Sequence, residues 1–138
     1  MSMSNDIVNT FLRTMADTAT NRDLDAHMDL ISQKVQLFGV PGFEVIGYDD
    51  WHAQCQHEFS QGLIKKVSYQ GLKIITPMEK RIMFKTIETV EATDGTCNIM
   101  GIEVILENEK DGKWRISQER ILTDDELEHD KQSGLLDA

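Results

Sequence analysis

The sequence is short of cysteine, proline and basic residues, and these shortages exclude several classes of protein. Its 138 residues include two cysteines and two prolines, and 14 Lys and Arg stand against 24 Asp and Glu, a formal net charge of −10. Nucleic acids and anionic membranes are poor partners for such a chain, because binding phosphate needs a basic surface. No apolar run reaches the roughly 18 residues that span a membrane.

The sequence also lacks a secretory leader and any metal or cofactor motif. Residues 1–6 contain no apolar stretch, so we expect a cytoplasmic protein in which Cys55 and Cys97 are reduced and buried. His52 and His57 fall on different sides of a helix, and no glycine cluster has the spacing of a phosphate or dinucleotide loop. We therefore expect no metal and no cofactor.

Helical periodicity dominates the first half of the chain. Apolar residues recur at three- and four-residue spacing over residues 5–20, and Asp23 is a suitable N-cap for a second, short helix. Residues 32–38 and 43–46 have the pattern of short strands. Residues 48–61 carry the apolar stripe of a third helix.

Long strands are predicted for the second half. Residues 63–76, 80–93, 96–109 and 113–122 are rich in β-branched and apolar side chains, and Asp-Gly pairs separate the last three as hairpin turns. Helices that precede an antiparallel meander indicate the α+β class and one domain over residues 5–122.

The end of the chain differs in composition. Residues 123–138 contain six acidic residues and a single lysine. We expect an acidic C-terminal tail that is solvated and that the fold does not need. The alternative is a tail that docks on a basic partner.

Four segments, in this order, resemble the NTF2-like superfamily, which includes the SnoaL-like proteins. They are Asn21-Arg22-Asp23-Leu24-Asp25, Leu30-Ile31-Ser32 leading into Val35-Gln36-Leu37, Gly42 to Gly47 followed by Tyr48-Asp49-Asp50-Trp51, and Asp111-Gly112-Lys113-Trp114-Arg115-Ile116. The resemblance implies three N-terminal helices packed in a strongly curved, mainly antiparallel sheet, a cone-shaped half-barrel around an apolar pocket. The superfamily includes isomerases, dehydratases, polyketide cyclases and domains that only bind, so the fold does not decide the function.

The ketosteroid isomerases of this superfamily use a carboxylate base at the end of the first strand, a tyrosine on the first helix and an acid on a long strand. Here the base position falls at Leu37–Phe38, and the tyrosine position falls near Thr14 or Met15. Only Ile102-Glu103-Val104 matches the segment that carries the acid. The isomerase base and tyrosine are therefore not matched.

Glu103 is the first candidate catalytic residue. Side chains alternate along a strand, which puts Glu103 on the face of Ile99, Gly101 and Ile105. We expect this face to line the pocket, where burial would raise the pKa of the carboxyl and Gly101 would leave room for a ligand. In the opposing interpretation, Glu103 faces outward and pairs with a cation such as Lys85 or Arg115, while the other face meets the helices.

His27 is the second candidate, because it lies within an apolar stripe where it is either a pocket acid–base group or a satisfied histidine at the edge of the core. The resemblance also suggests a set of ligand-binding residues. They are Phe38, Trp51, Phe59, Met15 and Gly101.

Three functions remain open. The first is binding of a small apolar or amphipathic molecule in the cone pocket. The second is a cofactor-free enzyme of the isomerase, dehydratase or polyketide-cyclase type that uses Glu103, alone or with His27, and the third is a dimeric interaction module without a ligand. Buried polar groups aimed into a closed cavity would favour the enzyme, and an apolar cavity without titratable groups would favour binding. We also predict a homodimer through the outer face of the sheet, because strand 96–109 is apolar on both faces.

Overall fold

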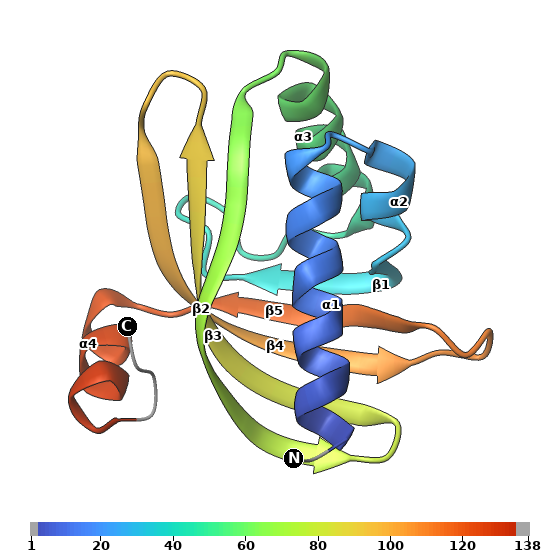
Figure 1. The fold of residues 1–138 in the computed structure, drawn as a ribbon, viewed down its shortest axis with the longest axis vertical. Helices are drawn as coiled ribbons and strands as arrows, with labels where there is room; N and C mark the ends of the chain where they lie inside the picture. Colours follow the sequence, from blue (N-terminus) through green and yellow to red (C-terminus); the bar gives the residue numbers. More distant parts are fainter. Residues whose placement is uncertain (1–2, 135–138) are drawn as a thin grey trace.

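The computed structural model describes residues 3–134, and within this range it has four helices and five strands (Figure 1). The elements run in the order α1 (Met3–Thr20), α2 (Leu24–Met28), β1 (Ile31–Phe38), α3 (Tyr48–Ser60), β2 (Ile64–Met78), β3 (Arg81–Ala92), β4 (Cys97–Asn108), β5 (Trp114–Ile121) and α4 (Asp124–Gln132). Two segments differ from the sequence prediction. Residues 43–46 contribute a single bridge, Ile46 to Leu37, instead of a strand, and a fourth helix follows the last strand.

The strands form one mixed, unclosed sheet in the order β1-β5-β4-β3-β2. Every neighbouring pair is antiparallel except β1 and β5, which run parallel. Register shifts interrupt β1, β2 and β5, and extra residues of this kind bend a strand and increase its twist. One lies at Gly71, whose φ of +74° suits glycine. The expected α+β fold with a curved, mainly antiparallel sheet is confirmed.

The concave face of the sheet packs against the first three helices, and Figure 1 shows α1 lying across it. The apolar stripe of α1 is buried against side chains that point inward from β3, β4 and β5. Large buried members of this core include Phe11, Ile31, Ile82, Phe84, Ile102, Leu106 and Ile116. On β4 the even-numbered residues therefore face the helices. This confirms the opposing interpretation, in which the face that carries Glu103 points outward.

The other face of the sheet carries α4, which Figure 1 shows on the side away from α1. A methyl group added at Gly101 would lie 2.9 Å from the Cδ1 atoms of both Leu122 and Leu127. Lys85 Nζ lies 2.9 Å from Asp130 Oδ2, and both side chains are largely buried. Gly101 thus makes room for α4 rather than for a ligand.

The segment 124–132 differs from the solvated tail that its composition predicts. Thr123 and Glu126 form a capping box that starts the helix, and Glu126 also binds Arg120 at 2.8 Å. The prediction of a solvated tail considered only the number of charges in this segment. Their spacing puts Glu126, Leu127 and Asp130 on one side of a helix.

The cysteines also differ in part from expectation. Both are free, and Cys55 is buried, but Cys97 is exposed because it starts β4 directly after a hairpin turn. No helix within residues 3–134 is long and apolar enough to cross a membrane.

Candidate functional site

A partly open cavity of about 230 Å³ lies between helices α1 to α3 and strands β2 to β5, here called the cone cavity. Its lining comprises Met15, Ala19, His27, Trp51, Cys55, Glu58, Phe59, Ile64, Val67, Tyr69, Glu88, Val90, Asn98, Met100 and Glu119. A dry cavity of about 150 Å³ can bind benzene, so the cone cavity has room for a molecule of about one ring with substituents.

Glu88 and Tyr69 form a cross-strand pair inside this cavity. They are direct register partners on β3 and β2, and the Tyr69 hydroxyl donates a hydrogen bond of 2.9 Å to Glu88 Oε2. Burial raises the pKa of Glu88, and the hydrogen bond from Tyr69 offsets part of that shift. Burial and the nearby carboxyls also hold the pKa of Tyr69 well above its ordinary value, so it stays a hydrogen-bond donor.

Glu119 is the second carboxyl of the cavity, and it is less exposed than the half-buried Glu88. Its side chain is 7% exposed, and no residue within 3–134 hydrogen-bonds its carboxyl. Burial, followed by the charge of Glu88, holds the pKa of Glu119 well above its ordinary value. Two like charges in one desolvated site disfavour double ionisation, so the two carboxyls together hold a proton to a higher pH than an isolated glutamate would.

His27 reaches the same cavity from α2. Its Nδ1 lies 2.8 Å from Thr18 Oγ1, and its ring meets Phe59 edge to face with centroids 5.4 Å apart. Because the single Thr18 hydroxyl proton is donated to the Thr14 carbonyl, we assign the imidazole proton to Nδ1, which leaves Nε2 unprotonated. Burial lowers the pKa of His27 to about 4, so the ring is neutral at neutral pH.

The residues proposed from sequence divide into two groups. Met15, His27, Trp51 and Phe59 line the cone cavity, whereas Phe38, Gly101 and Glu103 do not. Whether any of them acts on a ligand stays a prediction.

The expectation that Glu103 faces the pocket is wrong. Glu103 Oε1 lies 3.4 Å from Arg120 Nε on the outer face of the sheet. The physical reason is that Ile102 and Val104, its apolar neighbours on β4, fill the core instead. Arg120, and not Lys85 or Arg115, supplies the outward partner.

Sequence reasoning missed Glu88, Glu119 and Tyr69 as a group. Glu88 does follow the inward alternation of Ile82 and Phe84, but nothing in the sequence shows that Tyr69 is its register partner. The inward direction of Glu119 could not be predicted because of the register shift in β5. The shift brings Ile116 and Glu119 to the same face although they are three residues apart. Strict alternation from Ile116 would have sent Glu119 outward.

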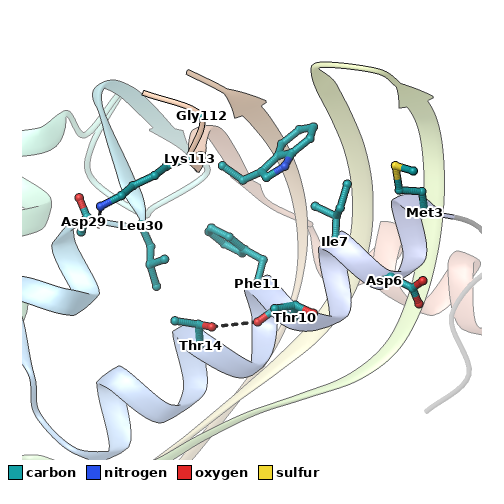
Figure 2. A pocket seen from close by; sticks show the side chains of 11 residues that line it. Met3, Asp6, Ile7, Thr10, Phe11, Thr14, Asp29, Leu30, Gly112 and Lys113 are labelled. Carbon is teal, nitrogen blue, oxygen red and sulfur yellow. Dashed lines mark hydrogen bonds and ion pairs between the residues drawn. The ribbon is translucent and has the colours of Figure 1, made fainter. Parts of the chain in front are cut away.

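A second depression lies between α1 and the β4–β5 hairpin, and Figure 2 shows the side chains around it. It measures about 470 Å³ and is lined largely by apolar side chains such as Ile7, Phe11, Leu30 and Trp114. At its edge Asp29 pairs with Lys113 at 2.8 Å, and hydrogen bonds from Lys113 and Arg115 lower the pKa of Asp29. This groove therefore holds no carboxyl pair of the kind found in the cone cavity.

Comparison with known proteins identifies a family and several structures of the same fold. No curated protein sequence matches the chain. An NTF2-like protein from Cytophaga hutchinsonii superposes with a TM-score of 0.73 at 12% identity, covering 89% of this chain and 99% of that one. ActVI-ORFA from Streptomyces coelicolor gives 0.71 at 10% identity, with 90% and 99% covered. A putative scytalone dehydratase from Novosphingobium aromaticivorans gives 0.70 at 11% identity, with 88% and 87% covered.

At such identities these structures share the fold alone, and the sequence itself supplies the family. The model of the SnoaL-like domain matches residues 8–121, from the first buried turn of α1 to the end of β5. This range contains every residue that lines the cone cavity. The chain therefore belongs to the SnoaL-like domain family, and its fold is the one seen in NTF2-like proteins.

Proposed function

We propose that this protein is a cofactor-free acid–base enzyme of the isomerase or dehydratase type. Its substrate is a small, mainly apolar molecule of about one ring, held in the cone cavity. The observation that carries the proposal is that two carboxyls, the half-buried Glu88 and the buried Glu119, line one largely apolar cavity. Carboxyls with raised pKa values in such a site are suited to proton transfer near neutral pH.

The two carboxyls have different roles in this mechanism. Ionised Glu88, held by the hydrogen bond from Tyr69, accepts a proton from a carbon next to a substrate carbonyl. Neutral Glu119 donates its proton to the carbonyl oxygen, which gives an enol. Return of a proton from Glu88 to carbon and from the enol oxygen to Glu119 completes an isomerisation and restores both groups.

Hydrogen exchange tests this function without the natural substrate. The protein would be incubated with cyclohexanone in D₂O near neutral pH, and loss of the α-hydrogens would be followed by proton NMR. We expect exchange above the buffer rate, reduced about 100-fold or more in Glu88→Gln and in Glu119→Gln. Glu103→Gln, which changes a carboxylate on the outer face, is the control and keeps the wild-type rate.

Exchange at the buffer rate, or full exchange by both variants, would contradict the proposal. Binding without catalysis is the second function, and the apolar walls from Met15, Val67 and Met100 favour it. Binding of cyclohexanone that shifts the NMR signals of these walls without any hydrogen exchange would select it. The interaction module has no support from the interior, which is not filled.

A further inference from the structure

The cone cavity carries charge of one sign. Three of its lining residues are glutamates, Glu58, Glu88 and Glu119, and none is a lysine or an arginine. The one basic side chain there, His27, is neutral because burial lowers its pKa to about 4. A ligand in this cavity therefore meets a negative potential that no basic side chain of the lining cancels.

Several carboxylates on the sheet and its hairpins have cationic partners. Arg115 binds Asp29, Glu109 and Asp111 at 2.8–3.0 Å. Arg120 joins Glu103 and Glu126, and Asp130 pairs with Lys85. By contrast, no residue within 3–134 forms an ion pair with Glu58 or Glu119. Glu119 is also only 7% exposed. Exposed carboxylates that lack a cation are solvated by water, whereas these two line a cavity and are shielded from water in whole or in part, so a cationic ligand could pair with them.

Glu58 and Asn98 mark the opening of the cavity. Asn98 is exposed and Glu58 is half-buried, whereas Glu119 lies deep. Trp51 and Phe59 flank Glu58 on the same side of α3 and supply aromatic faces, which attract cations. The charge of Glu58 also reaches inward, since it raises the pKa of Cys55 and of Glu88.

We propose that the substrate of the cone cavity is a small organic cation, whose ammonium group binds Glu58 at the opening beside Trp51 and Phe59 while its ring and oxygen lie inside. This inference rests on the proposed function and names the substrate class. It predicts that anions are rejected and that an uncharged molecule of the same shape binds less tightly.

Three ligands that share a hydroxylated six-membered ring test the charge. They are 4-aminocyclohexanol, cyclohexane-1,4-diol and 4-hydroxycyclohexanecarboxylate, titrated into the full-length protein by calorimetry at neutral pH and low salt. We expect the ammonium compound to bind about tenfold more tightly than the diol, a difference of about 1.4 kcal/mol, and the carboxylate not to bind at millimolar concentration. Added salt should weaken the ammonium compound more than the diol, because the opening is solvated.

The variant Glu58→Gln tests whether the preference for the ammonium compound comes from Glu58. The variant should bind the diol as wild type does, while the preference for the ammonium compound falls to less than about threefold. Glu44→Gln removes the same charge from an exposed loop and should leave the preference intact. Circular dichroism confirms that both variants are folded.

The outcomes separate this inference from the function on which it rests. Equal affinity for the ammonium compound and the diol, tighter binding of the carboxylate, or an unchanged preference in Glu58→Gln overturns the cationic substrate. In each case cyclohexanone exchange that depends on Glu88 and Glu119 would still support the acid–base enzyme. If none of the three ligands binds, the cationic substrate is wrong, and the exchange experiment alone decides the function.

Discussion

Glu119 is a residue at which stability and function oppose each other. Taking a carboxylate out of water disfavours its charged form, and within residues 3–134 nothing hydrogen-bonds this carboxyl to compensate. Glu88, by contrast, is only half-buried and accepts a hydrogen bond from Tyr69. Groups held at such a cost are typical of sites that bind or react rather than of a core selected for stability.

Replacing Glu119 by glutamine should therefore stabilise the protein at high pH. The folded state keeps Glu119 protonated above the pH at which the unfolded chain ionises it, so the folded state binds more protons and its stability falls as pH rises. Glutamine does not titrate. We expect the Tm of Glu119→Gln to exceed that of wild type by several degrees at about pH 8 and to match it below about pH 4. Equal Tm values at the higher pH would show that Glu119 is not desolvated.

His27 should make the protein less stable as the pH falls, the opposite pH dependence to that of Glu119. Its pKa is about 4 in the folded protein against an ordinary value of 6.5, so the unfolded chain binds the extra proton between these values. The free energy of unfolding should decrease as pH falls from 6.5 towards 4, by at most about 3 kcal/mol from this group. Urea titrations across this range measure it, with His27→Gln as the comparison. The same pH dependence in wild type and variant would remove His27 as its source.

At the scale of secondary structure, the predictable elements are those whose buried face has a regular period. The stripe of α1 and the hairpins around Asp94-Gly95 and Asp111-Gly112 are visible in the sequence and present in the structure. The irregular features were not predictable. Neither the register shift in β5 nor the contact of Leu127 with the Gly101 position can be deduced from one sequence, because each depends on the neighbouring element.

Helix α4 provides the clearest test at this scale. Truncation before Asp124 removes the ion pair of Lys85 with Asp130 and uncovers the apolar surface at Gly101 and Leu122 that Leu127 packs against. Burying a large apolar side chain contributes about 1.5–3 kcal/mol, so we expect Tm to fall by about 10 °C. Removal of residues 134–138 alone is the control, because it leaves Leu127, Asp130 and the C-cap Ser133 in the chain. A truncated protein within a few degrees of wild type would restore the interpretation of this segment as a dispensable tail.

At the scale of the whole molecule, the sequence predicted the fold better than the site. The order of helices and strands determines which surfaces can meet, and that order was legible from periodicity and turns. The carboxyl pair is a property of side-chain register across the sheet. Met15, Trp51 and Phe59 could be placed near the cavity from the fold, but Glu88 and Glu119 come from different strands and meet only in three dimensions.

The predicted homodimer belongs to this scale and stays a prediction. Helix α4 covers the outer face near Gly101, while Ile99 on the same face of β4 is 61% exposed. A second subunit that covers Ile99 would make an isologous contact. Light scattering at micromolar concentration should give about twice 15.7 kDa, and Ile99→Lys should halve that mass. A wild-type mass near 15.7 kDa would show that the exposed face has no partner copy.

The parallel pairing of β1 with β5 has a consequence for how the chain acquires its structure during synthesis. Strands β2 to β5 pair with sequence neighbours, so these hairpins can form as soon as they leave the ribosome. Strand β1 is made first but must wait for residues 114–121, and until then its apolar side chains Ile31 and Val35 have no sheet to join. Closure of this long-range contact is therefore the slow step, and the nascent β1 is the segment most exposed to wrong partners.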